Sequence, residues 1–152
     1  MPLPAQYAHT NLVAYNWERL ARFYSEVFGC ESIPPERDYS GPVLERATGL
    51  PDARLTGVHL RLPGWGEAGP TLEIFQYAEA ATGGPAALNR PGFTHIAFAV
   101  KDVVAAREAV LAAGGAEVGE LSVFETADGR QVTMQYLADP EGNIVEVQRW
   151  AD

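Results

Sequence analysis

His9-Thr-Asn-Leu-Val-Ala14, near the beginning of the chain, and His95-Ile-Ala-Phe-Ala-Val100, past its middle, are two strand-like stretches that each open with a histidine. Each is followed by an amphipathic helical run, one or two glycines, and a glutamate that lies 22 residues after the histidine. Such self-similarity at matched spacing is typical of a chain that contains one structural unit twice. We therefore predict two halves with the same order of elements.

Each half also ends in a short apolar strand with a glutamate at its centre. These strands are Thr71-Leu-Glu-Ile-Phe75 and Asn143-Ile-Val-Glu-Val-Gln148, with Glu73 and Glu146 in the middle. The order of histidine strand, helix, further strands and glutamate strand thus occurs twice.

The two helices have clear start and stop signals. A run from Trp17 to Phe28 follows Asn16, which can cap it, and ends at Gly29. A second run from Val103 to Ala113 follows Asp102 and ends at Gly114. Each run has an apolar stripe at helical spacing, so each helix is predicted to cover one face of a sheet.

The candidate site residues lie on the opposite face of their strands from the aliphatic residues. Alternate side chains of a strand point to opposite sides of the sheet, so His95 lies opposite Ile96 and Phe98. Glu73 lies opposite Leu72 and Ile74 in the same way. We therefore expect four polar side chains to face one cavity: His9, Glu73, His95 and Glu146.

The first half is longer by 13 residues between its second strand and its glutamate strand. Gly41–Leu50 can form one or two helical turns before Pro51, and such an insertion is a plausible flap or cavity rim. In the second half, Ala127-Asp-Gly129 is typical of a hairpin turn, and Asp139-Pro-Glu-Gly-Asn143 of a turn that leads into the last strand.

Length and composition are those of one globular domain of 152 residues. A net charge of -9 without clustered Lys or Arg argues against a nucleic-acid partner. The first residues resemble no signal peptide, and no apolar stretch approaches the ~20 residues that cross a bilayer, so we expect a cytoplasmic protein without a membrane partner. The single cysteine, Cys30, is interpreted as a packing residue.

Two imidazoles and two carboxylates form a mixed site for one divalent first-row metal, with Zn, Ni, Co, Mn and Fe all possible. Four protein ligands leave two adjacent positions, which suits a small substrate with neighbouring oxygens, and the metal then acts as a Lewis acid during proton transfer. The candidate bases are Glu73, Glu146 and Glu45, the last from the insertion. His59 shares a face with Arg61 and has no counterpart in the second half, so it is interpreted as an exposed strand residue or one that lies beside a ligand without binding the metal.

The segments that match a known superfamily are His9, Leu72-Glu-Ile74, Phe93-Thr-His-Ile-Ala-Phe98 and Asp139-Pro-Glu-Gly-Asn-Ile-Val-Glu-Val147. Through them the chain resembles the vicinal oxygen chelate superfamily over nearly its whole length. The resemblance implies an α+β fold of two tandem βαβββ modules, about 6–78 and about 92–150 within one domain of residues 1–152, that form an open eight-stranded barrel around the metal, often as a homodimer. The ligand set looks like that of bacterial glyoxalase I, whereas methylmalonyl-CoA epimerase usually has Gln where Glu73 stands. This implies a glyoxalase-like lyase or isomerase that stabilises an enediolate.

Two alternatives stay open. An extradiol-type dioxygenase holds Fe(II) by two histidines and one carboxylate, which His9, His95 and Glu146 could provide, although Glu73 would crowd the open positions. A non-catalytic protein that binds a drug or another small molecule, like the bleomycin resistance members, would not need the four ligand-type residues. A fosfomycin-type transferase is a lesser possibility, and no sequence feature identifies a glutathione pocket.

Overall fold

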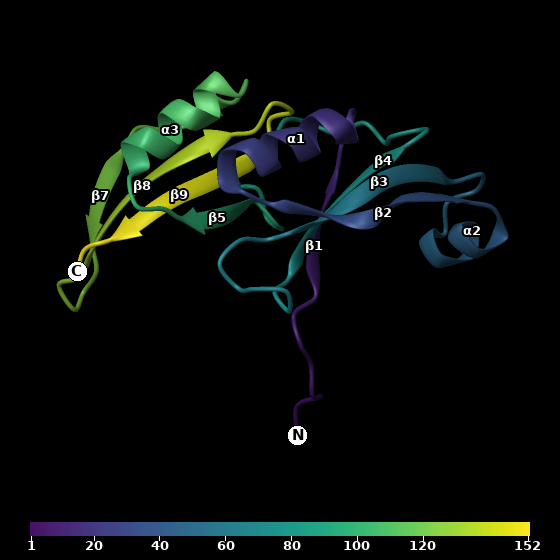
Figure 1. Cartoon of the computed structure of the whole chain (residues 1–152), viewed down its shortest axis with the longest axis horizontal. Helices are drawn as coiled ribbons and strands as arrows, with labels where there is room; N and C mark the ends of the chain where they lie inside the picture. Colours follow the sequence, from purple (N-terminus) through teal and green to yellow (C-terminus); the bar gives the residue numbers. More distant parts are fainter. The chain divides into compact units, whose positions relative to one another are not determined.

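The computed structural model describes residues 1–152, which form two compact units, 1–82 and 83–152. Figure 1 traces their elements. The first unit contains β1 (His9–Val13), α1 (Trp17–Phe28), β2 (Glu31–Ser40), α2 (Pro42–Thr48), β3 (Arg54–Arg61) and β4 (Thr71–Tyr77). The second contains β5 (His95–Ala99), α3 (Val103–Ala112), β6 (Ala116–Glu117), β7 (Ser122–Glu125), β8 (Gln131–Ala138) and β9 (Ile144–Trp150).

Each unit is built on one sheet, and the two sheets share a topology. The first has the order β1-β4-β3-β2, and the second has the order β5-β9-β8, with β6 and β7 both pairing with β8. In each sheet the histidine strand is parallel to the glutamate strand, and the other pairs are antiparallel. The predicted α+β class and the repeated order of elements are confirmed.

The strand count differs from the expected eight, and neither sheet closes on itself as a barrel. Nine strands are present because the second unit has two short strands, β6 and β7, at the position that β2 takes in the first. The edge is irregular in the first unit as well, since the pairing of β2 with β3 shifts register between Ile33 and Arg37. Both edge strands are therefore interrupted, but only the second is divided in two.

The N-caps of both helices and the C-cap of α1 are the predicted residues, whereas the C-cap of α3 is Ala113 instead of Gly114. The side chain of Asn16 accepts a hydrogen bond of 2.9 Å from the Arg19 amide, and Gly29 ends α1 in the left-handed conformation. Asp102 accepts a 3.0 Å bond from the Ala105 amide at the start of α3. These bonds satisfy amides that have no partner within the helix.

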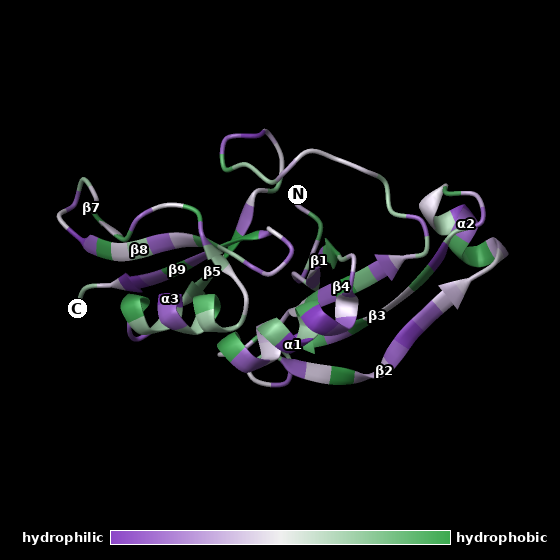
Figure 2. Ribbon diagram, turned by 90° about the horizontal axis from the view of Figure 1, so that it is seen from above, coloured by the Kyte–Doolittle hydropathy of each residue, from purple (hydrophilic) through white to green (hydrophobic).

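A helix covers one face of each sheet, and the core lies between them. In the first unit, α1 contacts β3 and β4, and its buried residues Leu20, Phe23 and Tyr24 lie over a sheet face that includes Leu72 and Ile74. In the second unit, α3 contacts β8 and β9. The apolar residues buried in that unit include Val103, Val110, Leu137, Val145 and Val147. Figure 2 shows the alternation of apolar and polar residues along the strands.

The insertion in the first unit contains the predicted short helix, α2, which lies between β2 and β3 (Figure 1). In the second unit, a turn between β8 and β9 is organised by Asp139, which is 3% exposed. Its carboxylate accepts hydrogen bonds from the Glu141 amide at 2.9 Å, the Asn143 amide at 3.0 Å and the Asn143 side chain at 2.9 Å. The predicted turn is thus a closed hydrogen-bonded loop.

No helix in the structure combines the length and the apolar character needed to span a membrane.

Candidate functional site

In the first unit, the polar candidates lie on the sheet face opposite α1. His9 pairs with Thr71, and two residues further along β4 lies Glu73, flanked by Asn11 on β1 and His59 on β3. Paired residues of neighbouring strands share a face. Glu73 therefore lies in the middle of a row of three polar side chains from three strands.

The carboxylate of Glu73 has close partners on both oxygens. The Asn11 amide donates to Oε1 at 2.9 Å, and Nε2 of His59 lies 2.7 Å from Oε2. Nε2 of His9 is 3.6 Å from Oε1. The side chains of Glu73 and His59 are 12% and 19% exposed, whereas that of His9 is 43% exposed, so the histidine on β1 is the one open to a ligand.

The spacing between His9 and Glu73 fits two ligands of one metal ion. With metal–ligand bonds of about 2.1 Å, donors at tetrahedral or octahedral angles lie about 3.0–3.4 Å apart. The 3.6 Å between His9 Nε2 and Glu73 Oε1 needs only a small adjustment to reach that range. The 2.7 Å between His59 and Glu73 is instead a hydrogen-bond distance.

Glu146 and His95 have the same relative placement in the second unit. His95 on β5 pairs with Ile144 on β9. Glu146 lies two residues after Ile144 on β9, as Glu73 lies two residues after Thr71 on β4. The residue opposite Glu146 on β8 is Tyr136, whose ring meets the His95 ring edge-on at 5.1 Å. Glu146 accepts one long hydrogen bond, 3.4 Å from the Gln148 amide.

The two sheets thus present the predicted histidine and glutamate at corresponding register positions. Within each unit, the structure brings the pair onto one face of adjacent strands. Neither unit by itself holds three His, Cys, Asp or Glu side chains grouped so that they could bind a metal ion. Each unit contains one of the two predicted pairs of a histidine and a glutamate.

The sequence left open whether His59 is exposed or lies beside a ligand, and the structure places its Nε2 2.7 Å from Glu73. It has no histidine counterpart in the second unit, but Tyr136 occupies the matching position, opposite the glutamate. The available signal was the alternation along β3, which puts His59 on the same face as Arg61. The contact itself depends on the pairing of β3 with β4 across residues 62–70, which the sequence pattern did not define.

Burial lowers the pKa of His59 below its ordinary value of 6.5, and the charges of Arg37 and His9 act in the same direction. Glu73 raises that pKa but does not outweigh the other effects. Burial thus favours the neutral imidazole, which has a single N–H to donate. When Nε2 donates to Glu73, Nδ1 accepts from the Thr71 hydroxyl, which lies 3.2 Å away.

Glu45, the third candidate base, lies in α2 and has a local partner. Its Oε1 accepts a hydrogen bond of 2.6 Å from the Asp52 amide in the connection that leads to β3. This connection reaches β3 at Arg54, which is five residues before His59. The two positions are therefore about 16 Å apart along the strand. A catalytic role of Glu45 stays a prediction.

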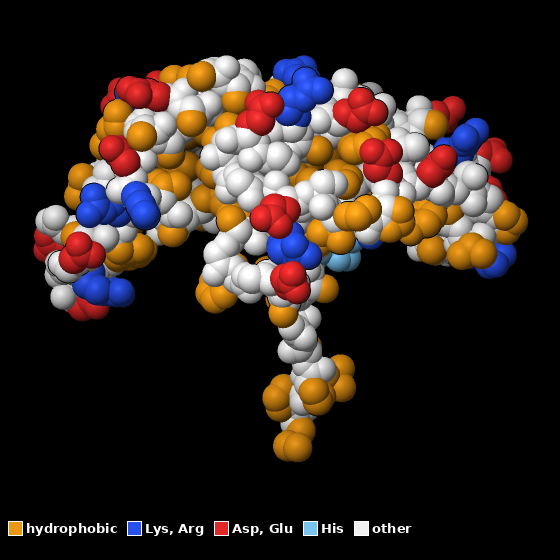
Figure 3. Space-filling view, in the orientation of Figure 1, with side chains coloured by type: hydrophobic (Ala, Val, Ile, Leu, Met, Phe, Trp, Pro, Cys, Tyr) orange, Lys and Arg blue, Asp and Glu red, His pale blue; other side chains and the backbone are white.

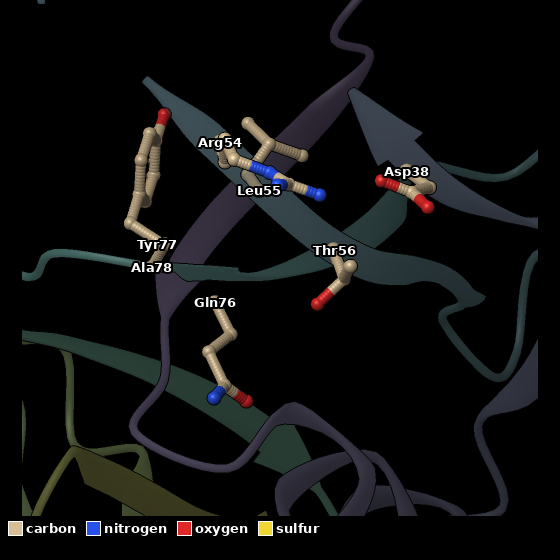
Figure 4. A pocket seen from close by; sticks show the side chains of 7 residues that line it. All are labelled: Asp38, Arg54, Leu55, Thr56, Gln76, Tyr77 and Ala78. Atoms are coloured by element: carbon tan, nitrogen blue, oxygen red, sulfur yellow. The ribbon is translucent and has the colours of Figure 1, made fainter. Parts of the chain in front are cut away.

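A pocket of about 240 Å³ lies elsewhere in the first unit, and Figure 4 shows its lining side chains. Thr56 and Gln76 point to one side of the sheet in this view, while Tyr77 points to the other. Thr56 is an odd number of residues from His59, as Gln76 is from Glu73, so both lie on the opposite sheet face from the candidate ligands. The Gln76 side chain accepts a 3.1 Å bond from the Trp17 amide at the start of α1. Part of this pocket is therefore lined from the sheet face that does not carry the candidate ligands.

The model of the glyoxalase-like domain family matches residues 10–148. The chain belongs to this family. Among solved structures, this glyoxalase-like chain is similar to a glyoxalase family protein from Bacillus cereus, at 16% identity and a TM-score of 0.83, over 99% of this chain and 97% of that one.

It is also similar to a glyoxylase/bleomycin resistance protein/dioxygenase domain from Frankia, at 17% identity and a TM-score of 0.62, over 99% and 95% of the two chains. An enzyme of the same broad family from Burkholderia phytofirmans has 18% identity and a TM-score of 0.59, over 97% and 100%. At these identities the likeness shows the fold alone. No curated protein matches the glyoxalase-like chain in sequence. The expected resemblance to the vicinal oxygen chelate superfamily is confirmed at the level of the family.

Proposed function

We propose that this glyoxalase-like chain is a metal-dependent lyase or isomerase, and that His9, Glu73, His95 and Glu146 bind one divalent metal ion. The observation that carries the proposal is the matched register: in both sheets, the glutamate lies two residues beyond the residue that pairs with the histidine. Two unrelated structural residues would have no reason to recur at the same strand positions of a repeat.

The donor set determines the class of metal and substrate. Imidazole nitrogen and carboxylate oxygen suit Zn, Ni, Co, Mn and Fe, and four protein donors leave two neighbouring positions of a six-coordinate ion. A small substrate with adjacent oxygens fits those positions. A bound metal would supply a Lewis acid for negative charge on the substrate oxygen.

The protein's own part in the reaction is to move a proton from the carbon beside that oxygen. A carboxylate is the available base, and Glu73 and Glu146 are the two candidates in the proposed site. Glu146 is the less restrained of the two, since its hydrogen bond from Gln148 is 3.4 Å long. Glu73 is held by Asn11 and His59 at shorter distances.

The test begins with the metal content of protein purified without chelator. We expect about one equivalent of a first-row metal per chain, and activity with methylglyoxal plus a thiol, or with an acyl-CoA, once the metal is restored. Glu73→Gln and Glu146→Gln should each lower metal content and activity. Glu26→Gln, which changes an exposed glutamate of α1, is the matched control.

Three results would contradict the proposal. A protein that retains no metal, and whose ligand binding is unchanged by Glu73→Gln and His95→Ala, would instead be a binding protein. Oxygen uptake with catechols that depends on Fe(II) would identify a dioxygenase. Equal metal content in Glu73→Gln and in the Glu26→Gln control would remove Glu73 from the ligand set.

A further inference from the structure

His59 has two polar partners, one at each nitrogen of its ring. Nε2 lies 2.7 Å from Oε2 of Glu73, and Nδ1 lies 3.2 Å from the hydroxyl of Thr71. An ionised carboxylate only accepts hydrogen bonds, so Nε2 carries the hydrogen and donates a hydrogen bond to Glu73. The Thr71 hydroxyl can then donate to Nδ1, which fixes the plane of the ring.

Glu73 is restrained on its other oxygen as well. The side-chain amide of Asn11 donates to Oε1 at 2.9 Å, so the carboxylate is held from β1 and from β3 at once. Each carboxylate oxygen has two lone-pair directions, and one hydrogen bond uses only one of them. The two contacts therefore set the orientation of the group and still leave each oxygen a direction for another partner.

The second unit lacks this arrangement. Tyr136 takes the position of His59, and its ring meets the ring of His95 instead of donating a nitrogen to Glu146. Asn11 is replaced by Ala97, which pairs with Glu146 and has no hydrogen-bonding side chain. The restraint on the carboxylate is a property of the first unit only.

We propose that His59 is a positioning residue for Glu73: its Nε2–H holds the carboxylate in the orientation that presents a free lone pair to a metal ion. This inference rests on the proposed function, in which Glu73 is a ligand. Hydrogen-bonding partners of metal ligands typically change metal affinity by about 10–100-fold when they are removed. His59 touches neither metal nor substrate in this role.

The test measures the affinity of metal-free protein for Co²⁺ by titration, together with the visible spectrum of the Co²⁺ form. His59→Phe keeps a ring of similar size and removes the donor, so we expect it to weaken Co²⁺ binding by about 10–100-fold and to alter the spectrum. His59→Gln, which retains an N–H, should recover most of the affinity. Thr56→Val changes the same strand on the α1 side of the sheet and serves as the matched control.

A purely structural role would give a different result. If His59→Phe binds Co²⁺ within twofold of the unmodified protein, or if His59→Gln is as weak as His59→Phe, the proposal is overturned. The melting temperature of each metal-free variant separates folding from positioning. A loss of affinity that follows a lowered melting temperature in every variant also counts against it.

The same experiment distinguishes this inference from the proposed function. If Glu73→Gln weakens Co²⁺ binding and His59→Phe does not, Glu73 is still a ligand and only the role of His59 is refuted. If the unmodified protein binds no Co²⁺, and neither substitution has an effect, the ligand assignment fails and the role of His59 fails with it.

Discussion

Gly57 lies where the site face of the first sheet has no room for a side chain. A Cβ at this position would lie 2.0 Å from the carbonyl oxygen of Ile74 and 2.7 Å from Cδ1 of Phe75. The oxygen belongs to the neighbouring strand and cannot move without disturbing the pairing of β3 with β4. Gly57 thus allows the Phe75 ring to lie beside the row that contains Glu73 and His59.

Gly57→Ala should therefore lower the free energy of unfolding by about 1–3 kcal/mol or more, as the insertion of extra atoms into a well-packed region does. Urea denaturation followed by circular dichroism measures the change. Gly83→Ala is the control, because a Cβ there meets nothing within 4 Å. An equal loss of stability in both variants would contradict the packing argument.

Cys30 is a second residue whose surroundings predict its behaviour. The residue is 3% exposed, and burial raises the pKa of its thiol to about 12. The thiolate is the reactive form, so we expect no reaction with a thiol reagent at pH 8 until the protein is unfolded in urea. Because the folded thiol holds its proton more tightly than the unfolded one, its contribution to stability is complete below pH 9 and falls as the pH rises toward 12. Rapid labelling of native protein at pH 8 would refute this.

At the scale of elements, α1 begins at a single side-chain cap. Asn16 accepts the Arg19 amide at 2.9 Å, and replacing an N-cap of this kind with alanine costs about 1 kcal/mol. We expect Asn16→Ala to lower the free energy of unfolding, measured by urea denaturation, by that amount and Asn16→Ser to retain most of the stability. Since α1 covers β3 and β4, the loss should appear in global unfolding, and a variant without a shift would show that the cap is dispensable.

The helices and the strand faces were the predictable part of the structure, because their signals are local. The caps at Asn16 and Asp102 and the alternation around Glu73 each depend on a few neighbouring residues. Strand pairing is not local: the contact of His59 with Glu73 depends on how β3 and β4 align across residues 62–70. The division of the second edge into β6 and β7 was equally hidden, since strands this short have no clear sequence period.

For the whole molecule, the proposed metal links binding to folding. A ligand that binds only the folded state stabilises it by about 2.7 kcal/mol at a concentration 100 times its Kd. Metal-free protein should therefore gain stability on addition of Zn²⁺ or Co²⁺ and lose it again with EDTA, and Glu146→Gln should reduce the gain. Equal gains in Glu146→Gln and in Glu26→Gln would indicate that the ion binds elsewhere.

The surface charge of the chain affects the metal experiments. The chain carries a net charge of -9, and on the face in Figure 3 acidic side chains are dispersed, with Lys and Arg among them. Dispersed acidic groups attract divalent cations weakly and without a defined site. The Glu26→Gln control is thus needed in each metal experiment, because it shows how much the loss of one surface carboxylate changes this general attraction.

The turn at Asp139 has a consequence for how the length of this chain can drift during evolution. Its carboxylate accepts hydrogen bonds from the amides of Glu141 and Asn143, which sets the start of β9 at Ile144. Deleting one residue between that turn and Glu146 would send the glutamate to the α3 side, since strand side chains alternate. Insertions and deletions should accumulate near α2, where one half already exceeds the other, and be purged from the six residues that lie between Asp139 and Glu146.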